Sequence, residues 1–270
     1  MLLFLLMAAP ALLTNARLET RVLSGPLDAA VRQAARGTEP AWVAWHAPHH
    51  GEGSACCARI ERGHRLEGGG CRLESSRTFN VNDGRDAGSA GFHVLLRVSS
   101  GRVERVRAYT DDCVLDAEGR PVVWLEGVPP AESVALLKEL LSDAARPKRF
   151  AEEALTAIAL HASPEALRAL LDLAKRHASS EVRSGALFWL AQRAGDEARA
   201  AITRAIEQDP ETEVKRQAVF ALSEMQDGVP LLIDLARRHK NPAVREQAFF
   251  WLGESEDPRA LAFFEEVLGR

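Results

Sequence analysis

In the last part of the chain, apolar positions recur with the period of an amphipathic helix, and one short phrase returns at a nearly fixed interval. The phrase is a valine, a basic residue and, three positions later, an alanine, and each copy runs on into a leucine. It begins at Val182, Val214 and Val244, at intervals of 32 and 30 residues, and a fainter copy covers Ala154 to Ile158. A repeat of this length predicts stacked helix pairs, each burying its apolar face on its neighbours.

The spacing of apolar residues and the positions of capping residues and prolines predict where these helices lie. The first helices of the pairs are expected at 130–143, 164–177, 196–207 and 229–239. The second helices are expected at 148–162, 181–194, 211–226 and 242–254, and a lone helix at 258–268. Four sites offer an N-cap oxygen followed by proline: Ser163-Pro164, Asp209-Pro210, Asn241-Pro242 and Asp257-Pro258. The pattern predicts an α-solenoid of about four helix pairs plus a terminal helix over residues 129–270, and hence a mainly α fold.

The chain between residues 17 and 128 has the pattern of a small β-rich domain. Pro26 to Gly37 reads as a short helix, and Ala41 to Trp45 as a strand that stops before Pro48. From His49 to Gly91, residues typical of irregular structure predominate.

Two hairpins are predicted after this loop. Phe92–Val98 and Arg102–Tyr109 flank a Ser-Ser-Gly turn, and uneven apolar spacing in the second arm predicts a bulge. Cys113–Leu115 and Pro121–Leu125 predict a second hairpin. We therefore expect an antiparallel β or α+β domain that disulfides support, since so small a domain buries little surface alone.

The repeat region resembles the HEAT-repeat proteins and their short-repeat bacterial relatives over about 130–270. The likeness rests on the valine-basic-alanine-leucine phrase, on the Phe-Trp-Leu ends at Phe188 and Phe250, and on the segment Asp257 to Leu261. The resemblance implies a scaffold for protein–protein contacts. Some bacterial relatives look similar to phycobilin lyases, so a lyase-like or other enzyme-associated role is the alternative. The layout also resembles uncharacterised exported bacterial proteins, while the N-terminal half matches no family by its residues.

The N-terminus and the cysteines together predict export. Residues 1–13 are an apolar run too short to span a membrane, and a small residue, Ala16, precedes Arg17, so residues 1–16 are expected to be a signal peptide. The protein would then be periplasmic or secreted. The even number of cysteines before the repeats predicts disulfides in such a compartment: Cys56, Cys57, Cys71 and Cys113. Because adjacent cysteines seldom pair, Cys56 and Cys57 are each expected to bond Cys71 or Cys113, in either arrangement.

Histidines close to these cysteines raise the alternative of a metal-binding N-terminal domain. His46, His49, His50 and His64 fall in the same stretch, and His and Cys are common metal ligands. Their spacing fits no specific zinc signature, and thiolates held in disulfides would not bind an ion. We expect no metal and no cofactor.

A partner is expected on the second helices of the repeats. On a helical wheel Phe188 falls roughly opposite the buried arc, as do its repeat mates Phe220 and Phe250, so the three rings could form a ladder. The expected binding residues are this ladder, one positive entry and the acidic border: Phe188, Phe220, Phe250, Arg216, Glu224 and Glu254. Such a surface suits an apolar or amphipathic segment with some basic residues. The alternative is that the rings pack sideways between helices or are covered by the N-terminal domain.

Two further features have structural explanations of their own. The basic row Arg183, Lys215 and Arg245 is expected to bond acceptors in the neighbouring repeat, such as Asp172 or Asp234. In the terminal helix Phe263 and Phe264 are adjacent and cannot both face inward, so one could mark a homo-oligomer contact.

Charge and motifs limit the other classes of function. The net charge of −4 lacks the basic excess that binding phosphate backbones requires, so nucleic acid is not an expected partner. No metalloprotease, phosphate-loop or nucleophile-elbow motif occurs, so we expect no enzyme. Asp111-Asp112 with the loop histidines is the one place where catalysis would be sought. The leading prediction is an exported scaffold that binds another protein or peptide segment, with no membrane contact after removal of the signal.

Overall fold

A computed structural model describes residues 13–51, 55–56, 59–61, 64–66, 69–75, 78–80, 91–143, 146–193 and 195–269. About half of the chain is helical, and the strands precede the helical repeats, as predicted. Contacts divide the chain into two compact units, Met1–Ala166 and Leu167–Arg270. The predicted signal peptide falls almost wholly outside the described residues. Its last residues, with those after it, form β1 (Leu13–Thr14) and β2 (Arg17–Val22).

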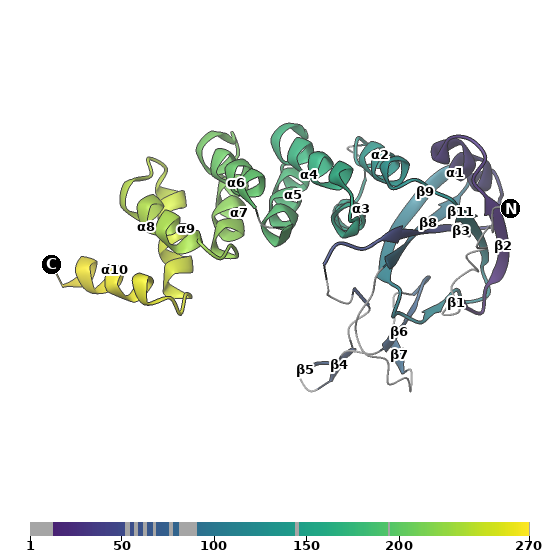
Figure 1. The fold of residues 1–270 in the computed structure, drawn as a ribbon, viewed down its shortest axis with the longest axis horizontal. Helices are drawn as coiled ribbons and strands as arrows, with labels where there is room; N and C mark the ends of the chain where they lie inside the picture. The colour runs from purple at the N-terminus through teal and green to yellow at the C-terminus, as the bar shows by residue number, and fades with distance from the viewer. Residues whose placement is uncertain are drawn as a thin grey trace, which may run out of the picture. The chain divides into compact units, whose positions relative to one another are not determined.

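The first unit is built on a five-stranded sheet with the strand order β2-β11-β3-β8-β9 (Figure 1). Its other strands are β3 (Ala41–Pro48), β8 (Gly91–Ser99), β9 (Arg102–Thr110) and β11 (Pro121–Glu126). A smaller sheet has the order β1-β10-β6-β7, with β6 (Gly69–Arg72), β7 (Thr78–Asn80) and β10 (Leu115–Asp116). Two short strands, β4 (Arg59–Glu61) and β5 (His64–Leu66), pair with each other.

The first predicted hairpin is confirmed and the second is wrong. β8 and β9 pair antiparallel, and the register shifts where Arg97 faces Arg105 and Val98 faces Val103, which leaves the predicted bulge in β9. β10 and β11 do not pair. β10 joins the smaller sheet, and β11 lies between β2 and β3, parallel to both. Val122 and Leu125 of β11 are buried, and a central place in the sheet provides that burial. The sheet is therefore mixed and not a purely antiparallel meander.

The first helix pair belongs to the same unit as the sheet. α1 (Leu27–Ala35) packs on β3 and β8, and α3 (Lys148–Leu160) packs on β9 and on α2 (Pro130–Leu140). Beyond α3, the amide of Ala162 donates to Pro48 O at 2.9 Å, and that of His50 donates to Leu160 O at 2.7 Å. The predicted boundary at 128/129 thus falls inside this unit.

A buried polar chain connects the sheet with both helices. Trp45 Nε1 donates to Ser133 Oγ at 2.8 Å, and Ser133 Oγ lies 2.8 Å from His161 Nε2. His161 Nδ1 lies 2.7 Å from Ala157 O, a carbonyl that can only accept, so this nitrogen carries the ring proton. Nε2 then accepts from the Ser133 hydroxyl. All three side chains are fully buried, and every donor in this series of hydrogen bonds has an acceptor.

The second unit contains the rest of the array. Helix α4 (Pro164–Arg176) begins in the last residues of the first unit and continues into the second. The helices after it are α5 (Ser180–Arg193), α6 (Asp196–Gln208), α7 (Thr212–Ser223), α8 (Gly228–Arg238), α9 (Pro242–Gly253) and α10 (Pro258–Leu268). Each boundary lies within a few residues of its prediction. The second helices α5, α7 and α9 pack on one another in sequence (Figure 1), and Ala186, Ala218 and Ala248 are fully buried where they cross.

Two of the four predicted caps are made. Asn241 accepts from the amide of Ala243 at 2.9 Å, and Asp257 from that of Arg259 at 2.8 Å. Asp209 accepts from the amide of Glu211 at 3.0 Å, but it is not the N-cap, because α7 begins only at Thr212. Ser163 Oγ has no hydrogen-bond partner among the described residues. None of the helices in the described residues combines the length and apolar character needed to cross a membrane.

Candidate functional site

Aromatic rings form a continuous row on α5, α7 and α9 in the second unit. Phe188 and Phe220 stack with centroids 6.2 Å apart and ring planes 10° apart. Phe220 contacts Trp251 at 4.8 Å, and Trp251 contacts Phe250 at 4.9 Å. At the other end Trp189 lies 5.2 Å from Phe188. We call these five residues the aromatic row.

The row differs from a simple ladder of three phenylalanines. Phe250 follows Phe220 in the repeat, but Trp251 is the ring of α9 that contacts Phe220. Phe188 and Phe220 are half-buried, so the rings do pack sideways between neighbouring helices. Phe250, however, is 54% exposed. Trp189 and Trp251 were absent from the predicted site, although each directly follows a ladder phenylalanine in the Phe-Trp-Leu phrase.

The row carries both an apolar surface and an unsatisfied donor. Trp251 Nε1 is buried and has no hydrogen-bond partner within the described part of the chain. A buried polar group without a partner costs about 1–3 kcal/mol.

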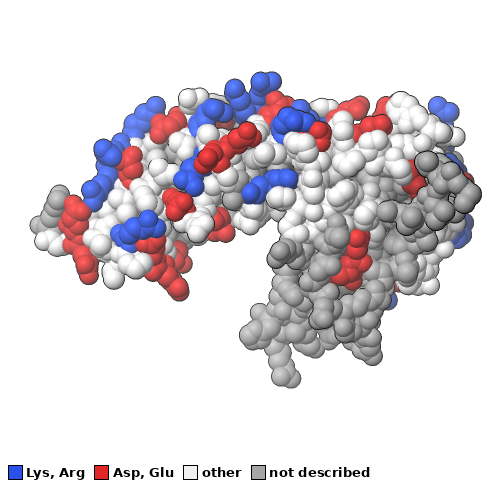
Figure 2. All heavy atoms as spheres, viewed as in Figure 1, with Lys and Arg blue, Asp and Glu red and all other residues white. Residues whose placement is uncertain are grey.

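Acidic side chains are exposed on the same three helices or directly after their last residue. They are Glu181, Glu213, Glu224, Glu246 and Glu254. Arg216 is half-buried, and its guanidinium lies 3.8 Å from the Glu246 carboxylate, too far for a strong ion pair. In the view of Figure 2, Lys and Arg line the upper edge of the repeats, whereas Asp and Glu predominate along the lower edge. The surface of α5, α7 and α9 therefore combines apolar rings with negative charge.

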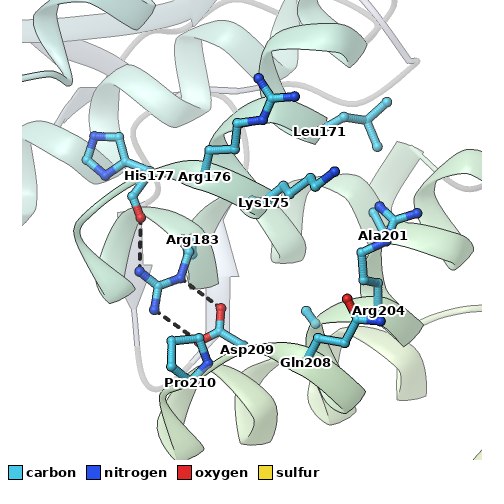
Figure 3. Close-up of a pocket in the computed structure, with 12 residues that line it drawn as sticks. Leu171, Lys175, Arg176, His177, Arg183, Ala201, Arg204, Gln208, Asp209 and Pro210 are labelled. Atoms are coloured by element: carbon cyan, nitrogen blue, oxygen red, sulfur yellow. Dashed lines mark hydrogen bonds and ion pairs between the residues drawn. The ribbon is translucent and has the colours of Figure 1, made fainter.

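The basic row of the repeat phrase is structural, and its acceptors differ from those expected. Arg183 makes a bidentate ion pair with Asp209, at 2.8 and 3.0 Å, and donates to the His177 carbonyl (Figure 3). It also donates to the Ala178 carbonyl. Lys215 Nζ donates to Ile206 O at 2.7 Å.

Arg245 repeats this arrangement, donating to His239 O at 2.7 Å. The expected acceptors Asp172 and Asp234 instead pair within their own helices, with Arg176 and Arg238. Each basic side chain of the phrase thus bonds carbonyls that end the preceding helix, which satisfies orphan acceptors.

A hollow of about 340 Å³ lies beside this ion pair, between α4 and α6 (Figure 3). Lys175, Arg176 and Arg204 line it together with Arg183 and Asp209. Because the buried ion pair forms part of its wall, the hollow is part of the packing between repeats.

The cysteines of the first unit gather in its core. Cys56 and Cys113 form a disulfide, which is one of the bonds expected. Cys71 is also disulfide-bonded, whereas Cys57 lies outside the described residues. Cys71 Sγ lies 3.9 Å from Cys56 Sγ. Cys71 and Cys113 are fully buried among Trp42, Leu73 and other apolar side chains.

Histidines and an aspartate meet at the end of the larger sheet. His46 on β3 faces His93 on β8, and Asp111 follows β9. His46 Nε2 lies 3.1 Å from one Asp111 oxygen, and His93 Nε2 lies 3.3 Å from the other. Gly91 runs beneath the pair, and a Cβ there would overlap His46 Nε2. The sequence indicated Asp111 and His46 but not His93, whose place opposite His46 is set by strand register.

The environment of this cluster shifts its proton affinities. Burial lowers the pKa of His93 to about 4, with His46 acting in the same direction and Asp111 opposing both. Burial alone would raise the pKa of Asp111, but the hydrogen bond from His46 and the nearby histidines lower it overall. His93 is therefore neutral and Asp111 charged near neutral pH.

Comparison with known proteins supports the repeat assignment. The family described as HEAT repeats matches residues 200–270. Among solved structures, human deoxyhypusine hydroxylase in complex with glycerol is 22% identical, with a TM-score of 0.36, over 49% of this chain and 43% of that one. YibA from E. coli is 24% identical, with a TM-score of 0.33, over 51% and 53%. The chain thus spans about half the length of either structure. No curated protein matches it.

The helix pairs and the family match agree with the predicted resemblance. The phrase that repeats at Val214 and Val244 falls inside the matched segment, and its buried valines, alanines and leucines form the contacts between helices. Residues 200–270 match the HEAT-repeat family, so this part of the chain carries HEAT repeats.

Proposed function

We propose that the repeats bind an amphipathic protein segment that carries basic residues, and that the aromatic row is its docking surface. The observation that supports this most is the exposed end of the row, Phe250, one helical turn from the exposed Glu246 and Glu254. The row offers apolar contact and no group that could move a proton, so the proposed activity is binding.

The free energy gained by burying each ring favours a partner segment that covers several rings at once. Full burial of a phenylalanine side chain is worth about 1.5–3 kcal/mol, so covering the exposed half of Phe250 gives about 1 kcal/mol. One ring cannot offset the entropy lost on association. An amphipathic helix places apolar side chains every three or four residues, which matches a row that crosses several helices. Basic residues on such a helix would face the glutamates, and this pairing adds specificity and a faster on-rate.

Two synthetic helical peptides test the proposal with the full chain. Both carry the same leucine face, but one has lysines and the other glutamates on its polar face. Titration is followed by peptide fluorescence anisotropy and by the intrinsic tryptophan fluorescence of the chain, to which Trp189 and Trp251 contribute. We expect the lysine peptide to bind with a salt-sensitive affinity and the glutamate peptide to bind at least about ten-fold more weakly. Equal affinity for both peptides would contradict the charge argument.

A matched pair of variants assigns the binding to the row. Phe250→Ala removes an exposed ring of the row, and Leu261→Ala removes an exposed apolar side chain of α10, which is 63% exposed. Neither should cost more than about 0.5 kcal/mol of stability. The lysine peptide should lose affinity with Phe250→Ala only. If both variants bind it like the wild type, the row is not the site.

A further inference from the structure

Three sulfur atoms lie together in the core of the first unit. The Sγ atoms of Cys56, Cys71 and Cys113 all lie within 4.8 Å of one another. They come from three separate places in the chain: the loop before β4, strand β6 and the turn after β9. Cys71 and Cys113 are fully buried and Cys56 is half-buried. Such a cluster places three potential ligands of a soft cation around one point.

One of the sulfur separations already matches what a thiophilic cation requires, while Cys56 and Cys113 are bonded to each other and must be reduced first. Zinc binds cysteine sulfur at about 2.3 Å in a tetrahedral geometry, which puts neighbouring sulfurs about 3.8 Å apart. Cys71 Sγ and Cys56 Sγ are separated by 3.9 Å. We propose that, once its disulfides are reduced, this cluster binds one Zn²⁺ through the thiolates of Cys56, Cys71 and Cys113.

Backbone hydrogen bonds hold the three cysteines in place independently of the sulfur chemistry. The amide of Cys71 donates to Val114 O at 2.8 Å, and that of Cys113 donates to Thr110 O at 3.0 Å. Thr110 also fixes the residue before Cys56, because its Oγ1 accepts from the amide of Ala55 at 2.9 Å. The sulfurs therefore stay gathered when the bond between them is broken.

The surroundings are apolar on the buried side of the cluster, where Trp42, Leu73 and Leu95 lie. Cys56 is half-buried, so water can fill the fourth ligand position of a tetrahedral zinc ion. Separate thiolates would repel one another in such surroundings, and a divalent cation offsets that repulsion. The apolar shell thus favours two states, disulfide-bonded or metal-bound, over free thiolates.

Conversion between these states takes two reductions of two electrons each, one for every disulfide. A dithiol reductant supplies two electrons and two protons to the Cys56–Cys113 bond, which breaks to give two thiols while the reductant closes to its own disulfide. The disulfide that holds Cys71 is reduced in the same way. On binding Zn²⁺ the thiols release their protons to solvent. A reducing compartment would therefore favour the zinc form and an oxidising one the disulfide form.

Metal analysis of the full chain tests the site. The protein is reduced with a phosphine, equilibrated with Zn²⁺, freed of loose metal by gel filtration without oxygen, and analysed for zinc. We expect one equivalent in the reduced wild type and none in the oxidised protein. With Co²⁺ in place of Zn²⁺, the reduced wild type should show thiolate-to-metal charge-transfer absorption.

Two variants separate this site from other metal ligands. Cys71→Ser keeps the Cys56–Cys113 disulfide for folding and should lose the zinc and the Co²⁺ absorption after reduction. His46→Ala removes a nearby metal-ligand type outside the cluster and should keep both. The proposal is overturned if the reduced wild type retains no zinc, or if Cys71→Ser retains as much as the wild type. A reduced chain that unfolds and does not regain its circular dichroism with Zn²⁺ contradicts it equally.

Discussion

The buried ion pair between Arg183 and Asp209 supports a sharp prediction about how the repeats are held together. The two side chains are only 8% and 6% exposed. The carboxylate of Asp209 accepts hydrogen bonds from two guanidinium nitrogens of Arg183 and from the amide of Glu211. Asp209→Ala would leave the arginine charge buried, with only the His177 and Ala178 carbonyls as partners. Breaking one side of such a pair costs about 3–5 kcal/mol.

The control is an ion pair of the same chemistry on the surface. Asp234 and Arg238 pair one turn apart on α8 with side chains 50% and 77% exposed, so Asp234→Ala should cost less than about 1 kcal/mol. Urea unfolding followed by far-UV circular dichroism, which reports mainly the helices, measures both. The double variant Arg183→Ala/Asp209→Ala should cost less than the two single losses added together, because it leaves no unpaired charge. Equal losses for Asp209→Ala and Asp234→Ala would refute this reasoning.

Two predictions concern the first unit. Ser133→Ala removes the buried hydroxyl that both Trp45 Nε1 and His161 Nε2 contact and should cost about 2–4 kcal/mol in urea unfolding. Thr156→Ala, which removes an exposed hydroxyl on α3, should cost under about 0.5 kcal/mol. A similar loss of stability in the two variants would contradict the role of the buried hydrogen bonds. His93 has a folded pKa of about 4, below the usual 6.5, so the unfolded chain takes up the extra proton and stability falls as pH decreases through this window. Between pH 7.5 and pH 5 the loss should be about 2 kcal/mol, and His93→Leu should flatten it; an unchanged slope would assign the pH dependence to other groups.

The helical half was predictable because its signals are local. The spacing of apolar residues, prolines such as Pro242 and Pro258, and the caps on Asn241 and Asp257 all act within a few residues of the helix they define. Asp209 shows the limit of this reasoning. It stands before a proline like the others, yet α7 begins only at Thr212, and its carboxylate also pairs with Arg183 of the preceding helix pair. A local cap signal cannot reveal an additional partner elsewhere in the fold.

The sheet and the sites depended more on distant pairing. Nothing in the residues of β11 says that it inserts between β2 and β3, because parallel neighbours are set by the whole sheet. His93 came to face His46 through that same strand register. In the aromatic row, the repeat phrase predicted the stack of Phe188 on Phe220, but Trp251 contacts Phe220 where a helical wheel would place Phe250. A wheel gives the direction of a side chain and not which ring fills the space beside it.

Mapping where the lysine peptide binds is the most direct test of the claim that the aromatic row binds a partner segment. A copy with one photoreactive residue on its leucine face is crosslinked to the full chain, and the attachment sites are found by mass spectrometry. The account predicts crosslinks on α5, α7 and α9 around Phe220 and Phe250, and their loss in competition with unlabelled peptide. Competable crosslinks confined to α10, to α4, α6 and α8, or to residues before α4 would contradict it.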